Sequence, residues 1–117
     1  MNHDNRDNVG KAYQYFNNKA VNSILSLMHP NVSWPESWDG GYIQGHNDLK
    51  DYWAKQWAEL HINVKPLTLK ENSKGQVEAT VHQIVKDLQG NITSDTILKH
   101  VYTFENGLIK LIEIHKP

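Results

Sequence analysis

The fold of this chain is decided by residues 76–117, which read QVEATVHQIVKDLQGNITSDTILKHVYTFENGLIKLIEIHKP. Apolar and polar residues alternate through 76–88 and 92–105, where Val, Ile, Thr and Tyr are frequent, and this predicts two long β-strands. A shorter, more apolar strand is predicted at 108–115. Asn106-Gly107 is typical of a two-residue hairpin turn, and Gly90 allows a similar turn. The stretch therefore predicts a three-stranded antiparallel meander.

The two turns also determine which residues lie opposite each other. A two-residue turn at Asn106-Gly107 places His100 opposite Glu113. A turn around Gly90 gives one sheet face a mixed set of side chains: Val77, Ala79, Val81, Gln83, Val85, Asp87, Leu98, His100, Tyr102 and Phe104. The apolar residues of the other face are Ile84, Ile97, Val101, Leu108, Ile112 and Ile114. Both faces carry apolar area, so both need to be covered.

The composition is that of one compact domain, residues 1–117. Twelve basic and 13 acidic residues give a net charge of −1, and Arg6 is the only arginine. This balance argues against nucleic acid or a membrane as a partner. Because the chain has no cysteine, disulfides and thiolate chemistry are excluded. The polar start lacks the apolar core of a signal peptide, so we expect a cytoplasmic protein.

Before the meander, hydrophobic spacing predicts three helices, at about 4–18, 20–28 and 47–60. A short edge strand is expected at 31–34, since Pro35 removes a backbone donor. The Gly-rich segment 36–45 predicts a loop. A further strand is expected at 62–71, with a bulge or an edge near Pro66, where the apolar phase slips from even to odd positions.

Four parts of the chain carry a resemblance: 27–34 (LMHPNVSW), Gly45 at the start of the third helix, 82–85 (HQIV) and 104–109 (FENGLI). They resemble the nuclear transport factor 2-like (NTF2-like) superfamily, in its SnoaL-like and ketosteroid-isomerase-related branch. The resemblance implies an α+β, cystatin-like cone, with three N-terminal helices packed on a strongly curved antiparallel sheet. It also implies a cavity for a small apolar molecule, without a cofactor. The implied activity is proton transfer on a cyclic or polyketide-like compound, and the alternative is a noncatalytic ligand-binding or dimerisation module.

The candidate catalytic pair is His100 and Glu113, because a carboxylate opposite an imidazole can orient it and raise its basicity. Tyr102 or Gln83 would then hold the oxygen of the substrate. The alternative is a buried pair whose only role is to satisfy its own hydrogen bonds. A metal site formed by His100, Glu113 and His115 is a weaker alternative, since no ligand spacing along the sequence supports it, and we predict none.

Four tryptophans, Trp34, Trp38, Trp53 and Trp57, fall within 24 positions. Together with Gln83 and Tyr102, they are the candidate substrate-binding residues. Trp53 and Trp57 share one helical face, where packing in the core is the alternative role. Trp38 lies in the Gly-rich loop, where no core periodicity requires it, so we predict that 36–45 forms the mouth of the cavity.

The outer face of the predicted sheet indicates an assembly. Its isoleucines and valine would form an exposed apolar patch on a monomer, and the predicted members are Ile84, Ile97, Val101, Ile112 and Ile114. We therefore predict a homodimer that forms through this face, with Thr80 and His82 in or near the interface.

Overall fold

The computed structural model describes residues 5–36 and 41–115. Its helices are α1 (Asn5–Asn17), α2 (Val21–Leu25) and α3 (His46–Glu59). Its strands are β1 (Met28–Pro35), β2 (Tyr42–Gln44), β3 (Leu60–Glu71), β4 (Val77–Asp87), β5 (Ile92–Glu105) and β6 (Leu108–His115). They form one sheet in the order β2-β1-β6-β5-β4-β3. Only β1 and β6 are parallel; the other neighbouring strands run antiparallel. The α+β class that we predicted is confirmed.

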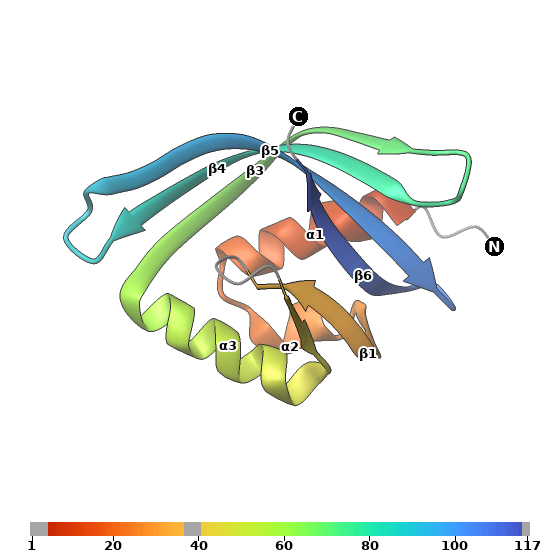
Figure 1. Cartoon of the computed structure of the whole chain (residues 1–117), viewed down its shortest axis with the longest axis horizontal. Coiled ribbons are helices and arrows are strands. Elements are labelled where there is room, and N and C mark those ends of the chain that lie inside the picture. Colours follow the sequence, from red (N-terminus) through yellow and green to blue (C-terminus); the bar gives the residue numbers. More distant parts are fainter. Residues whose placement is uncertain (1–4, 37–40, 116–117) are drawn as a thin grey trace.

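The sheet bends strongly, and the helices lie on its concave side (Figure 1). The helix α1 packs against the sheet through side chains spaced three or four residues apart, namely Val9, Ala12, Tyr13 and Phe16. Its last residue is tied to β3, because the Asn17 side chain donates to the Val64 carbonyl at 2.8 Å and accepts from the Val64 N–H at 2.9 Å. This clamp holds Phe16, the preceding residue, and Tyr13, one turn earlier, over the inner face of the sheet.

Several predicted elements have different bounds in the structure. The second helix ends at Leu25, and β1 already begins at Met28. The strand β1 is not at an edge, because β2, which lies inside the predicted loop, pairs with it through Ser33, Trp34 and Pro35. The predicted irregularity in β3 is confirmed, since the register shifts between Pro66 and Thr68. None of the three helices in the described ranges is long and apolar enough to cross a lipid bilayer.

The register between β5 and β6 differs from the prediction by one residue. The two-residue turn is present, with positive φ at Asn106 and Gly107. However, Phe104 pairs with Ile109 and Thr103 with Leu111, so Lys110 is an extra residue in β6. The remaining pairs are therefore His100 with Ile114 and Val101 with Glu113. The predicted pairing of His100 with Glu113 is wrong.

The bulge has a physical reason in the hydrophobic pattern. Ile109 and Ile112 are spaced by three residues, so in a regular strand they would point to opposite faces. With the extra residue both point to the core, where they are 0% and 2% exposed. Ile114 follows on the same face. The prediction that Ile112 and Ile114 belong to the outer face is therefore wrong.

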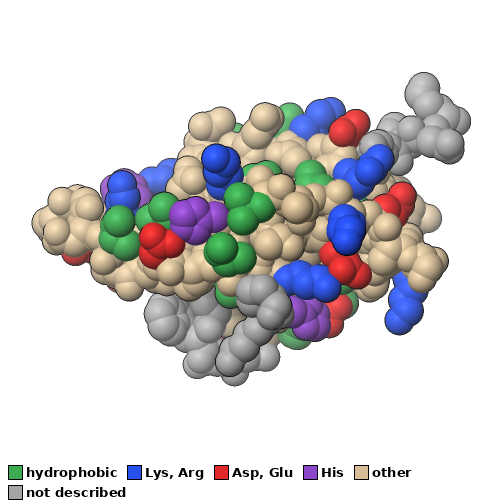
Figure 2. All heavy atoms as spheres, turned by 90° about the horizontal axis from the view of Figure 1, so that it is seen from above, with side chains coloured by type: hydrophobic (Ala, Val, Ile, Leu, Met, Phe, Trp, Pro, Cys, Tyr) green, Lys and Arg blue, Asp and Glu red, His purple; other side chains and the backbone are tan. Residues whose placement is uncertain are grey.

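The outer face mixes apolar and charged side chains. Viewed from above, hydrophobic side chains lie among histidine, lysine and acidic side chains over the more apolar half, and Lys, Asp and Glu side chains predominate over the other (Figure 2). On this face Ile97 is 49% exposed, and His82 contacts the Asp95 carboxylate at 2.6 Å. Lys99 pairs with Glu78 at 2.8 Å. With Ile112 and Ile114 turned inward, the apolar outer area is smaller than the sequence predicted.

Candidate ligand cavity

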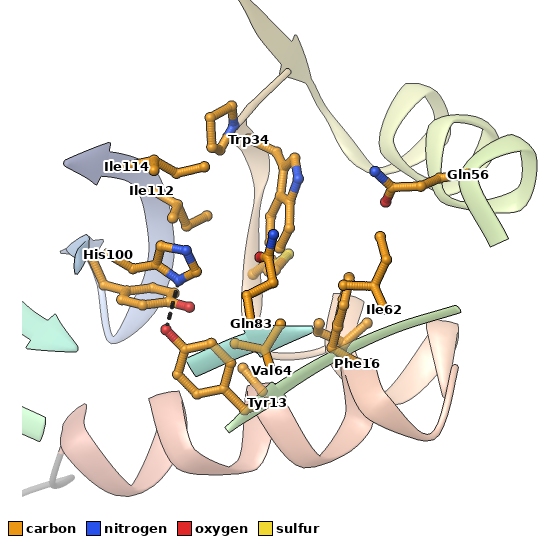
Figure 3. Close-up of a pocket in the computed structure, with 15 residues that line it drawn as sticks. Tyr13, Phe16, Trp34, Gln56, Ile62, Val64, Gln83, His100, Ile112 and Ile114 are labelled. Carbon is orange, nitrogen blue, oxygen red and sulfur yellow. Dashed lines mark hydrogen bonds between the residues drawn. The ribbon is translucent and has the colours of Figure 1, made fainter. Parts of the chain in front are cut away.

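A cavity of about 70 Å³ lies between the concave face of the sheet and the helices (Figure 3). Its walls come from α1, α2, α3 and from five strands. Its lining residues are Ala12, Tyr13, Phe16, Ile24, Met28, Trp34, Pro35, Gln56, Ile62, Val64, Gln83, His100, Tyr102, Ile112 and Ile114. None of these described residues is a lysine, arginine, aspartate or glutamate. The cavity is thus mostly apolar, with a few uncharged polar groups.

His100 is held by two tyrosines at the inner end of the cavity. The Tyr13 hydroxyl lies 2.9 Å from His100 Nδ1, at hydrogen-bonding distance. The Tyr102 ring meets the Tyr13 ring edge-on. The three rings pack together, with centroids 5.9 to 6.3 Å apart. A helix residue and two neighbouring inward residues of β5 thus form one packed group, with a hydrogen bond between Tyr13 and His100.

Burial makes this group electrically neutral at physiological pH. Desolvation lowers the pKa of His100 from its ordinary value of 6.5 to about 4, because a charged imidazole would lose its hydration here. Desolvation likewise raises the pKa of Tyr13 and of Tyr102 above the ordinary value of 10.0, since it disfavours a phenolate. All three side chains therefore act as uncharged hydrogen-bonding groups.

Two polar side chains, those of His100 and Gln83, face the cavity. His100 Nε2 is buried and makes no hydrogen bond with any described residue. The Gln83 side chain projects into the same cavity from β4, toward Trp34 (Figure 3). Buried polar atoms are normally hydrogen-bonded, and an unpaired one costs about 1–3 kcal/mol. The cavity therefore offers one hydrogen-bonding atom, Nε2 of His100, that no described residue uses.

An aromatic cluster forms the opposite wall. Phe16 and Trp34 stack with their ring centroids 6.0 Å apart. Trp53 meets Trp34 edge-on at 5.1 Å and stacks with Trp57 at 5.6 Å. Trp53 is fully buried, and the indole N–H groups of Trp53 and Trp57 have no hydrogen-bond partner among the described residues. Only Phe16 and Trp34 of this cluster border the cavity.

The structure divides the predicted site residues into separate groups. His100, Tyr102, Gln83 and Trp34 line the cavity together. Trp53 and Trp57 lie behind its wall, as packing residues. Trp38 lies outside the described residues, as does the central part of the loop that we predicted to form the mouth.

Glu113 does not reach the cavity. It lies on the outer face beside a groove that also contains Val101, Lys99 and His115. The predicted catalytic pair is therefore corrected: His100 has Tyr13, not Glu113, as its neighbour. The same register separates His100 from His115, and no three His, Asp or Glu side chains in the described ranges come together as metal ligands.

Tyr13 and Gln56 are the polar lining residues that sequence reasoning missed. Tyr13 was placed only on the core face of the first helix, and Gln56 only on the apolar stripe of the third. One signal was available for Tyr13, because a hydroxyl on a core face needs a buried partner. The sequence could not say which residue supplies that partner.

No protein-family model matches the chain. The fungal GPI inositol-deacylases of Chaetomium globosum and Neurospora crassa are each 26% identical to it, over 98 and 94 residues. These matches cover 75% and 72% of this chain but only 8% of each deacylase, so the chain spans a small fraction of the curated relatives that it matches.

Solved structures resemble the chain over nearly its whole length. An NTF2-like protein of unknown function from Burkholderia pseudomallei K96243 has a TM-score of 0.83 and 20% identity, covering 98% of this chain and 92% of its own. TerC, crystallised with polyporic acid, has a TM-score of 0.81 and 23% identity, covering 97% and 91%. A Mycobacterium tuberculosis protein in complex with estradiol-17β-hemisuccinate has a TM-score of 0.81 and 15% identity, covering 94% and 91%. The chain therefore has the NTF2-like fold.

Proposed function

We propose that this protein binds a small, neutral, mainly apolar molecule in the cavity of its cone. The apolar part of the ligand lies against Phe16 and Trp34, and a polar atom of the ligand reaches His100. The observation that carries this proposal is the His100 Nε2 atom, which is buried beside an apolar cavity and has no partner among the described residues. A ligand that hydrogen-bonds to this nitrogen removes the cost of leaving it unpaired.

The charge of the lining limits the ligand. An ion that enters an apolar cavity loses its hydration, and only an opposite charge or several hydrogen bonds can offset this loss. The described lining residues include no charged side chain, and burial lowers the pKa of His100 to about 4. The cavity therefore favours a neutral ligand over a carboxylate or an amine.

The size of the cavity limits the ligand further. One water needs about 10–15 Å³ of comparable space, and drug-sized ligands occupy pockets of about 300–1,000 Å³. The 70 Å³ observed here suits one ring or the end of a larger molecule. TerC and the M. tuberculosis protein have the same fold and were crystallised with ring compounds, which supports a ring as the part of the ligand that enters the cavity.

Binding is tested by calorimetry and by NMR titration with acetophenone and estradiol as probes. Ile114 borders the cavity and is 43% exposed, so Ile114→Trp should obstruct the site and weaken binding of the probes at least tenfold. Ile97→Trp is the matched control, because Ile97 is 49% exposed on the other sheet face. Equal binding by both variants, or no probe bound by the wild type, would count against the proposal.

Proton transfer on the bound molecule is a second candidate function. It is favoured by the Tyr13–His100–Tyr102 group, which lies at the only part of the described lining where three hydrogen-bonding side chains meet. The assay follows exchange of the acetophenone methyl protons in D₂O by NMR. Because burial keeps all three side chains uncharged, water takes the methyl proton, and the part of the group is to donate a hydrogen bond to the carbonyl oxygen. Catalysis requires faster exchange than in buffer and its loss in His100→Gln. If the protein bound acetophenone but did not accelerate exchange of its methyl protons, it would be a ligand-binding protein without this activity.

We also propose a homodimer through the outer face of the sheet. The exposed Ile97 and the neighbouring Ile84 supply the apolar part of that surface. The adjoining Lys99–Glu78 pair supplies both charges, so two copies related by a twofold axis can complement each other.

A further inference from the structure

We infer that Tyr13 fixes His100 in the tautomer that is protonated at Nε2, so that the imidazole donates a hydrogen bond into the cavity and selects ligands that carry an acceptor oxygen. Tyr13 acts as a positioning residue, through His100. This inference rests on the proposed binding function and names the ligand chemistry that the same cavity takes.

Two arrangements of protons are compatible with the positions of the Tyr13 oxygen and of His100 Nδ1. In the first, the Tyr13 hydroxyl donates to His100 Nδ1, and His100 carries its proton on Nε2. In the second, His100 carries its proton on Nδ1 and donates it to the Tyr13 oxygen. The distance of 2.9 Å between the Tyr13 hydroxyl and Nδ1 suits both.

The two arrangements differ in what they leave unpaired. The first leaves a single group without a partner, the Nε2–H of His100. The second leaves the Nε2 lone pair without a donor, and it also leaves the hydroxyl hydrogen of Tyr13 without an acceptor in any hydrogen bond of the described residues. Tyr13 is 5% exposed and Nε2 is buried. Because each unpaired buried group destabilises the fold, the first arrangement is favoured.

The direction of this hydrogen bond decides what His100 can do to a ligand. A nitrogen that already carries a proton cannot accept one, so Nε2 does not serve as a general base toward the cavity. It can donate to a carbonyl or ether oxygen, and it strengthens that bond if negative charge develops on the oxygen. The Gln83 amide, on β4, can either donate or accept a hydrogen bond. It therefore does not distinguish ligands that carry an acceptor from ligands that carry a donor, and His100 makes that distinction.

The tautomer is measured directly, without any ligand. Two-bond ¹H–¹⁵N NMR spectra of the wild-type chain at neutral pH distinguish a protonated Nε2 from a protonated Nδ1. We expect an unprotonated, hydrogen-bonded Nδ1 and a protonated Nε2 for His100. Tyr13→Phe should shift the Nδ1 resonance and populate the other tautomer, whereas Tyr102→Phe, the matched control, should keep the wild-type tautomer. Protonation at Nδ1 in the wild type would overturn the inference, even if neither variant folds.

Selection of the ligand is measured with two molecules of the same shape. Acetophenone carries a carbonyl oxygen where α-methylstyrene carries a CH₂ group, so only the first can accept a hydrogen bond. We expect acetophenone to bind about three- to tenfold more tightly to the wild type and the difference to shrink in Tyr13→Phe. Equal affinities would overturn the selection for an acceptor. If neither molecule nor estradiol binds, the proposed function fails, and the NMR result on the tautomer stands separately.

Discussion

The hydroxyl of Tyr13 meets Nδ1 of His100 at 2.9 Å, across 87 positions of the chain. This contact joins the first helix to β5, near the open end of the last hairpin. It takes the place of the His100–Glu113 pair that was predicted from the turn and from alternation. It also links stability to the cavity, because the same imidazole that holds the helix also borders the space open to a ligand.

Loss of the Tyr13 hydroxyl should destabilise the fold. Tyr13→Phe keeps the buried ring but leaves Nδ1 of His100 unpaired, so we expect the free energy of unfolding to fall by about 1–2 kcal/mol. Urea denaturation followed by tryptophan fluorescence measures this change. Tyr15→Phe, at a half-buried tyrosine of the same helix, should change it by less than about 0.5 kcal/mol. Equal effects of the two substitutions would show that the contact with His100 is unimportant.

Stability should depend on pH through His100. Its pKa is about 4 in the folded protein and 6.5 when unperturbed, so the unfolded chain takes up the proton first as pH falls. The free energy of unfolding should therefore be constant above pH 6.5 and decrease by about 3 kcal/mol between pH 6.5 and 4. The lowered pKa values of Glu78 and Asp87 act at more acidic pH, below their ordinary values of 4.5 and 3.8.

The dependence of the free energy of unfolding on pH is assigned to His100 by comparing variants in urea titrations from pH 4.5 to 7.5. His100→Gln should remove most of the decrease between pH 6.5 and 4.5, whereas substitution of the exposed His61 by Gln should keep the wild-type slope. A decrease of the same size in His100→Gln would mean that other groups cause it.

The two faces of the sheet should respond differently to loss of a polar group. Gln83→Leu removes an amide from the cavity, and we expect acetophenone to bind about fivefold more weakly. Glu113→Gln changes a side chain on the outer face, so its affinity should stay within about twofold of the wild type. Calorimetric titration of both variants checks the difference. A larger effect at Glu113 than at Gln83 would contradict the position of the cavity.

The proposed dimer makes a prediction about mass in solution. Ile97→Glu places a charge in the apolar half of the outer face and should convert a dimer into a monomer, because the buried charge would have no partner. Light scattering coupled to gel filtration measures the mass. Leu88→Glu is the control, since Leu88 is 53% exposed beyond the end of β4 and should leave the mass unchanged. A monomer mass for the wild type at high micromolar concentration would exclude this dimer.

Local patterns were sufficient to predict most of the strands. Alternation and turn chemistry located β4, β5 and β6, and the slip of apolar phase at Pro66 located the irregularity in β3. The same kind of slip exists between Ile109 and Ile112. The prediction nevertheless applied the register set by the Asn106-Gly107 turn to the whole of the last strand. A turn fixes the pairing only as far as the next bulge, and burial of Ile112 determines it beyond that point.

The site was less predictable than the fold because it depends on contacts between distant segments. His100, Tyr102 and Gln83 share a sheet face, and their common face follows from alternation. Tyr13 joins them only after α1 has packed across the sheet, and the position of that helix is set by tertiary contacts such as Asn17 with Val64. The residue pattern within α1 or within β5 therefore does not predict the contact between Tyr13 and His100.

The bulge in β6 also limits the apolar area on the outer face. If Lys110 were paired with β5 in a regular register, the rest of the strand would turn over, and Ile112 and Ile114 would join Ile84 and Ile97 on the outer face. Leu111, Glu113 and His115 occupy the outward positions instead. A β-sheet face that carried four isoleucines would be a strong site for unspecific self-association. The pairing of a single residue thus decides how prone this sheet is to aggregate.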